Sequence, residues 1–160
     1  MMKISKEQLD EFIKHNNYIE GVDSVIAHED AHKAWEWAFN NMFNINTNYI
    51  LHIHKILMNR INPRIAGKTR ECDVWIGGKK KIFISKYIFI EQLNDLCAKI
   101  LKEDMTSKEA HILFEAIHPF EDGNGRVGRI LMNIHRLRLN LPILIIHTGK
   151  EQEKYYGWFI

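Results

Sequence analysis

The sequence is poor in cysteine and proline, and it lacks an apolar segment long enough to cross a membrane. Two cysteines, Cys72 and Cys97, are too few for a disulfide framework, so we expect free thiols in a reducing compartment. Three prolines and nine glycines argue against a many-turned β-sandwich and favour helices. The longest apolar runs, such as residues 141–146, fall far short of the ~20 residues that a membrane span needs. The N-terminus has no apolar run typical of a signal peptide, so we expect a soluble, cytoplasmic protein with no membrane partner.

Neither sign of charge dominates. Twenty-two Lys and Arg residues against 20 Asp and Glu residues give a net charge of +2, which does not predict a nucleic-acid partner. Apolar residues make up 46% of the chain and aromatic residues 11%, which is enough for one sizeable core. Because 160 residues is an ordinary length for one domain, we expect residues 1–160 to form a single domain.

Apolar residues recur at helical spacing along most of the chain. The spacing predicts helices over residues 5–14, 26–41, 46–60, 90–102, 107–117 and 125–139, and a last helix from residue 150. Residues 15–22 are expected to be irregular or a second short helix. Between residues 65 and 85, β-branched residues alternate around a pair of glycines, which predicts a β-hairpin. The expected fold class is therefore mainly α with one small β-hairpin.

The segment His118–Arg129, HPFEDGNGRVGR, is the most informative part of the chain. The proline after His118 disfavours helical backbone there, so the preceding helix should end by presenting an imidazole, a natural general base near neutral pH. The glycines let backbone N–H groups approach an anion at the start of the next helix. Arg126 and Arg129 share a face of that helix, opposite its apolar stripe, and can grip phosphate oxygens. Asp122 is a carboxylate placed as Mg²⁺ often requires beside a phosphate site.

This segment resembles the signature of the Fic family, H-x-F-x-[D/E]-G-N-G-R-x-x-R, at every specified position. Residues 67–70 and 74–77 also look like the hairpin that is known as the flap in Fic proteins. The resemblance to the family extends from about residue 16 to the C-terminus. It implies a Fic-type helical bundle in which residues 65–85 form the flap. It further implies that residues 118–129 form the catalytic loop and the start of its helix.

The resemblance implies a protein adenylyltransferase, which moves AMP from ATP to a Ser, Thr or Tyr hydroxyl of a target protein. His118 would deprotonate that hydroxyl, Asp122 would hold Mg²⁺, and Phe120 would pack into the core. The flap would bind the target backbone as an added strand, clamped by Val74 and Ile76. Family members often pair through helix faces, so a homodimer is a further implied partner. The implied nucleotide ligands are Gly123, Asn124 and Gly125 around the phosphates, Arg126 and Arg129 on the outer phosphates, and Tyr155 or Tyr156 on the adenine, with core packing as the alternative for the two tyrosines.

Many Fic proteins carry an inhibitory motif, [S/T]-x-x-x-E-[G/N], and residues 16–21, NNYIEG, resemble it. Glu20 would pair with Arg129 and so occupy the arginine that the γ-phosphate needs. Asn16 departs from the motif because it stands where Ser or Thr is expected. A plain helix end at Glu20 and Gly21 is the alternative. Some relatives use the same glutamate to remove AMP, so a de-AMPylase is a second possibility on this fold.

Other functions remain open on the sequence. His28, Glu29 and His32 fit HExxH, the zinc-protease pattern, but Trp35 and Ala38 stand where the extended motif requires Gly and His. A Doc-like kinase shares the fold, yet it replaces the GNGR portion that this chain retains. A non-enzymatic module that keeps the nucleotide site is the last alternative. The chain ends at residue 160, in a region where relatives continue with more helix, and the sequence leaves open whether the adenine is fully covered.

Overall fold

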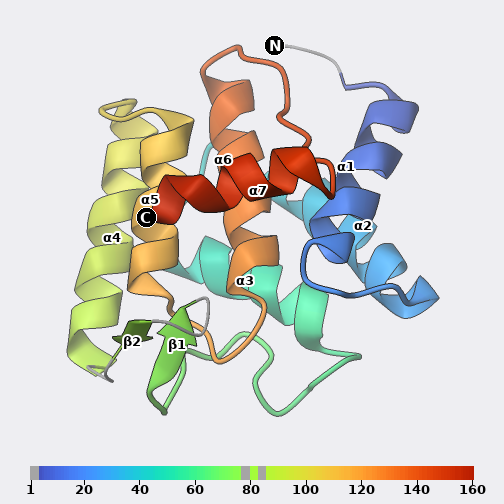
Figure 1. Ribbon diagram of the computed structural model, residues 1–160. Coiled ribbons are helices and arrows are strands. Elements are labelled where there is room, and N and C mark those ends of the chain that lie inside the picture. Colours follow the sequence, from blue (N-terminus) through green and yellow to red (C-terminus); the bar gives the residue numbers. More distant parts are fainter. Residues whose placement is uncertain (1–3, 77–79, 83–85) are drawn as a thin grey trace.

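Helices make up most of the chain, as the sequence predicts, with one antiparallel hairpin (Figure 1). The computed structural model describes residues 4–76, 80–82 and 86–160, and it describes their side chains except at positions 76, 80–82 and 86–88. The elements in chain order are α1 (Lys6–Tyr18), α2 (Val25–Asn40), α3 (Thr47–Met58), β1 (Val74–Ile76), β2 (Lys80–Ile82), α4 (Lys86–Lys102), α5 (Ser107–Ile117), α6 (Asn124–Arg138), α7 (Lys150–Tyr156) and a 3-10 turn, η1 (Gly157–Phe159).

Polar side chains fix where several helices begin. Ser5, Ser24 and Asn46 each precede a helix and accept a hydrogen bond from a backbone N–H of its first turn. Thr106 does the same for α5, and Glu109 bonds back to the Thr106 amide to complete a capping box. These caps explain why the predicted helix starts lie within one or two residues of the observed ones. The exception is α4, which begins at Lys86 rather than at residue 90.

Helix α6 runs through the middle of the bundle and contacts α1, α2, α3 and α5 (Figure 1). The other helices surround it, and α7 crosses one side of it. Twelve of its fifteen residues are buried. The sequence pattern predicts that Arg126 and Arg129 lie on a face of α6 opposite its apolar stripe. Both arginines are nonetheless buried, because residues of the N-terminal segment and Tyr155 contact this part of the helix. Of the helices in the described residues, none is long and apolar enough to span a membrane.

One local prediction differs from the structure, and another is confirmed where the structure describes it. Residues 15–18 continue α1 rather than forming an irregular stretch, because Asn16 and Asn17 are buried against the bundle at 2% and 0% exposure. The hairpin is present and pairs Val74 with Ile82 and Ile76 with Lys80. Its predicted glycine turn at residues 77–78 and the predicted strand residues 83–84 lie outside the described residues.

Candidate active site

His118 ends α5 in a left-handed conformation, with φ 49° and ψ 60°, which confirms the prediction that the helix stops there. Its Nδ1 lies 3.2 Å from the backbone oxygen of Glu115, which accepts a hydrogen bond. Nδ1 also lies 3.6 Å from the Glu115 carboxylate. Because Nδ1 is the donor, Nε2 carries the lone pair, and no hydrogen bond from the described residues reaches it. The neutral imidazole in this tautomer therefore offers Nε2 as a proton acceptor.

The Glu115 carboxylate is buried beneath His118, at 11% exposure. Burial alone raises the pKa of Glu115, but the contact with His118 and the electrostatic effects of His111 and Arg129 outweigh it and lower the pKa. A carboxylate that stays charged beside Nδ1 stabilises a protonated His118. Glu115 can therefore support the histidine after it has accepted a proton.

The Asn124 side chain holds the loop between α5 and α6 in shape. It accepts a hydrogen bond from the Phe120 amide at 2.9 Å and donates one to the Phe120 carbonyl at 2.8 Å. Phe120 is fully buried, in agreement with its expected packing role. Since both polar atoms of the Asn124 side chain are used in this way, only its backbone N–H remains to face a phosphate.

His54 on α3 holds the loop from outside. Its Nε2 donates to the Asp122 carbonyl at 2.9 Å, its Nδ1 accepts from the Gly67 amide at 3.0 Å, and its ring stacks on Phe120 with 3.8 Å between centroids. Burial lowers the pKa of His54 to about 4. A neutral imidazole is what these two hydrogen bonds require, so His54 supports the loop and does not act as a metal ligand.

Arg70 links the segment before β1 to the loop between α5 and α6. Its Nε donates to the His118 carbonyl at 2.8 Å and its Nη1 donates to the Cys72 carbonyl at 2.8 Å. The Arg70 amide also donates to the Pro119 carbonyl at 2.8 Å. The guanidinium is 1% exposed and lies over the Phe89 ring. Sequence reasoning placed Arg70 in the flap but missed this connection.

The start of α6 leaves backbone N–H groups available. Gly123 is the N-cap, with φ 85°, and no side chain caps the helix, so an anion can take that place. Asp122 lies beside it with its side chain 69% exposed, and one carboxylate oxygen accepts from the Gly123 amide at 2.7 Å. An exposed carboxylate next to an open helix N-terminus suits Mg²⁺, which needs one or two carboxylates together with phosphate oxygens and water.

Arg126 is buried and poorly paired. Its side chain is 2% exposed, Nη2 lies 3.9 Å from the Asp122 carboxylate and 3.2 Å from the Met58 sulfur, and Nε has no hydrogen-bond partner among the described residues. Burial lowers the pKa of Arg126, although Asp122 and Glu20 oppose that effect. A buried guanidinium with an unpaired N–H beside the helix N-terminus is suited to receive an anion.

Arg129 is paired by the N-terminal segment and by Tyr155 of α7 (Lys150–Tyr156). Its Nη2 contacts the Glu20 carboxylate at 2.6 Å, and its Nε donates to the Asn16 side-chain oxygen at 2.7 Å. Nη2 also donates to the Asn16 carbonyl at 3.2 Å, and Nη1 donates to the Tyr155 hydroxyl at 3.0 Å. Asn16, which departs from the family motif, thus binds Arg129 through both its side chain and its backbone.

The remaining predicted site residues differ in exposure. Tyr155 is 3% exposed, and its hydroxyl lies 2.8 Å from His111 Nε2, so it packs in the core. Tyr156 is 47% exposed. Val74 is 9% exposed, whereas its neighbour Trp75 is 58% exposed. The side chain of Ile76 lies outside the described residues.

The HExxH residues do not converge. His28 contacts Asp23 at 3.6 Å, His32 contacts Asp10 at 3.3 Å, and Glu29 contacts Arg60 at 2.8 Å. Within the described part of the chain, the one group of three or more candidate ligands that lie close together does not include them. A zinc-protease site is therefore not formed.

Residues 44–135 match the Fic/DOC family. Protein adenylyltransferase Fic from Aedes aegypti is 32% identical over 114 residues, which are 68% of this chain and 23% of that protein. Protein adenylyltransferase fic-1 from Caenorhabditis elegans is 29% identical over 118 residues, which are 69% of this chain and 23% of that protein. The chain thus spans less than a quarter of the length of these curated relatives.

Solved structures show the same fold. Fic-1 (residues 134–508) from Caenorhabditis elegans superimposes with a TM-score of 0.74 at 21% identity, covering 97% of this chain and 56% of that one. A Fic-domain signalling protein from Bacteroides thetaiotaomicron gives a TM-score of 0.75 at 17% identity, covering 94% and 70%. With the family match spanning more than half of the sequence, this chain belongs to the Fic/DOC family.

Proposed function

We propose that this protein is an adenylyltransferase that moves AMP from ATP to a hydroxyl side chain of a target protein. The observation that carries the proposal is the arrangement of His118, whose Nε2 has no hydrogen-bond partner among the described residues, beside an uncapped helix N-terminus and a buried, poorly paired Arg126. Relatives named protein adenylyltransferase support the choice of AMP over other transferred groups.

In the proposed reaction, Nε2 of His118 accepts the proton of the target hydroxyl as its oxygen attacks the α-phosphorus of ATP. The new O–P bond forms while the bond from the α-phosphorus to the bridging oxygen breaks, and pyrophosphate leaves. Glu115 stabilises the imidazolium through the 3.6 Å contact with Nδ1. Most of the rate acceleration would come from positioning and charge stabilisation, as in other phosphoryl-type transfers.

The phosphates would lie at the start of α6. The Gly123–Gly125 backbone would approach them, Arg126 would supply charge, and Asp122 would hold Mg²⁺. When bound, Mg²⁺ supplies positive charge that offsets the charge of the phosphate oxygens. Arg129 would bind the outer phosphates only after it leaves its present partners.

We infer that residues 16–21 inhibit the enzyme. The 2.6 Å contact between Glu20 and Arg129 occupies one edge of the guanidinium, and Asn16 occupies another. A carboxylate and a γ-phosphate cannot share that edge, because both are anionic. ATP would therefore bind with its outer phosphates misplaced until Glu20 moves.

The target protein would bind along the flap as an added strand. Val74 and Ile76 are our candidates for the clamp, and we add the exposed Trp75 between them as a further residue that would contact the target.

Cys72 and Cys97 are both free thiols, which supports a reducing compartment such as the cytoplasm.

The test uses ATP labelled on the α-phosphate, with Mg²⁺, and compares the wild type, Glu20→Gly and His118→Ala on the protein itself and on lysate proteins. Strong labelling by Glu20→Gly, weak labelling by the wild type and none by His118→Ala supports both the transferase and its inhibition. Equal labelling by the first two retains the transferase and removes the inhibition. Label transferred only from the γ-phosphate would identify a kinase, and no transfer of either label would contradict the proposal.

A further inference from the structure

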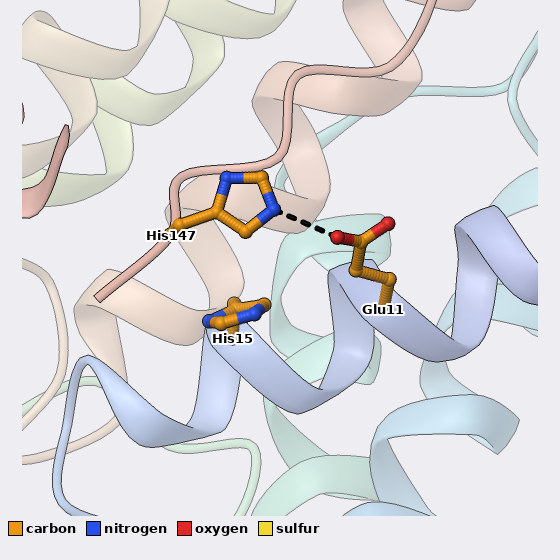
Figure 2. A group of neighbouring side chains, drawn as sticks. All are labelled: Glu11, His15 and His147. Atoms are coloured by element: carbon orange, nitrogen blue, oxygen red, sulfur yellow. Dashed lines mark hydrogen bonds and ion pairs between the residues drawn. The ribbon is translucent and has the colours of Figure 1, made fainter.

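A group of metal-binding side chains lies away from the catalytic loop. Glu11 and His15 are one helical turn apart on α1, and His147 faces them from the segment that leads into α7 (Figure 2). One candidate ligand atom from each residue lies within 4.8 Å of the other two. In a tetrahedral zinc site with bonds of about 2.0–2.2 Å, ligand atoms stand roughly 3–3.5 Å apart. Small rotations of three surface side chains would close that difference.

His147 is already oriented as a metal ligand. Its Nδ1 is hydrogen-bonded to the Glu151 carboxylate at 2.7 Å, while its Nε2 faces Glu11 at 2.7 Å. Glu151 is itself held by the His147 amide at 3.0 Å. Histidines that bind metals commonly donate their second ring N–H to a carboxylate, which fixes the ring and makes the ligating nitrogen more basic. Glu151 provides that support here, independently of the three clustered residues.

His15 is held near His147 by two contacts. The Thr148 amide donates to Nδ1 of His15 at 3.4 Å, and the two imidazole rings lie with centroids 4.7 Å apart. The cluster is reachable from solvent, because the side chains of His147 and Glu11 are 42% and 48% exposed. A cation could therefore enter without opening the bundle.

We propose that Glu11, His15 and His147 bind one Zn²⁺ ion, with water as the fourth ligand and Glu151 supporting His147. Two imidazoles and one carboxylate form a donor set that suits zinc and is poorly suited to Mg²⁺ or Ca²⁺, which prefer oxygen ligands. Binding replaces the proton that Nε2 of His147 shares with Glu11, and that proton is released to solvent. This site is separate from Asp122 and from the HExxH residues.

Bound zinc would join α1 to the segment before α7. These two parts of the chain are distant in sequence, and exposed hydrogen bonds from His147 to Glu11 and from Thr148 to His15 join them. A ligand that binds only the folded state adds to its stability. Zinc should therefore stabilise the chain against unfolding even though it lies outside the core.

The experiment titrates Zn²⁺ into the tag-free, chelator-stripped protein, with heat of binding and native mass spectrometry as readouts and thermal unfolding as a second measurement. The variants are His15→Ala, His147→Ala and Glu11→Gln, together with Glu151→Gln for the support. His32→Ala is the matched control, because it removes an exposed histidine that contacts Asp10 on the neighbouring helix.

We expect one zinc per wild-type chain, with a rise in Tm, and the same result for His32→Ala. His15→Ala, His147→Ala and Glu11→Gln should lose saturable binding and the rise in Tm, while folding as the wild type does without metal. Glu151→Gln should bind about 10–100-fold more weakly. Saturable binding that survives in both histidine variants, no saturable binding by the wild type, or competition by equimolar Mg²⁺ would each overturn the proposal.

Discussion

Glu20→Gln tests the proposed inhibitory contact because it removes a charge and changes the shape of the side chain very little. Arg129 has a side chain 2% exposed and Glu20 one 37% exposed, and their polar atoms are 2.6 Å apart. Glutamine can still accept a hydrogen bond from Arg129, but it no longer offers a negative charge to the buried guanidinium. Arg129 then keeps Asn16 and Tyr155 as partners.

The size of the effect follows from these exposures. A hydrogen bond between charged groups contributes about 1.5–3 kcal/mol, and solvent screening at the partly exposed Glu20 lowers this to about 1–2 kcal/mol. For a chain of this length that corresponds to a fall in Tm of about 2–8 °C. In the wild type, this free energy of about 1–2 kcal/mol must be overcome before Arg129 can bind a phosphate of ATP. Because the substitution removes it, AMP labelling should rise by the corresponding factor of about 5–30.

Both quantities are measurable on the same preparations. Thermal unfolding gives the change in Tm, and transfer of α-labelled phosphate gives the change in activity. Glu29→Gln is the control, since Glu29 contacts Arg60 on the surface at 2.8 Å and should change Tm and labelling little. A rise in labelling with no loss of Tm would show that Glu20 does not inhibit through this contact. A loss of Tm with unchanged labelling would mean that the contact is only structural.

Three further predictions concern buried groups. Asn16→Ala removes the acceptor of Arg129 Nε and should lower the free energy of unfolding, measured with urea, by about 1–3 kcal/mol; no change would mean that water replaces the amide. Burial lowers the pKa of His111 to about 4, so below pH 6.5 the unfolded chain binds a proton that the folded chain does not. Stability should fall by about 2 kcal/mol from pH 7 to 5, and His111→Gln should lose that part of the pH dependence in unfolding curves. Gly128→Ala would place a Cβ 2.8–2.9 Å from three side chains of α5 and should cost about 1–3 kcal/mol, whereas Gly157→Ala, with nothing within 4 Å, should unfold as the wild type does.

The helices and the catalytic loop were predictable because their signals are local. A capping residue such as Thr106 stands next to the helix it starts, and apolar spacing repeats within each helix. The loop from His118 to Arg129 is contiguous, so its pattern is visible without a fold. The structure confirms that these parts form helices joined by a tight loop.

Contacts between distant residues were harder to predict. Asn16 and Arg129 are 113 positions apart, and His54 and Asp122 are 68 apart. Helical periodicity predicts a solvent-facing polar side for Arg126 and Arg129 of α6. The pattern within one helix carries no information about a second helix that covers this side with its own polar groups. Glu115 offered a signal that sequence reasoning missed, because a carboxylate three residues before a histidine in a helix lies on the same side of it.

Arg70 has a consequence for how such a protein could diversify. Its guanidinium donates hydrogen bonds to the carbonyl of His118, the proposed base, and to the carbonyl of Cys72, which lies just before β1. The exposed part of the hairpin beyond that fixed point, which includes Trp75, should therefore tolerate changes in sequence with little effect on the position of His118. A flap exchanged from residue 73 onward should alter which polypeptide is recruited and leave the reaction itself unchanged. The choice of target protein and the transfer reaction would then depend on different parts of the chain and could change independently. On the proposed function, an engineered flap could direct the transfer to a chosen target protein.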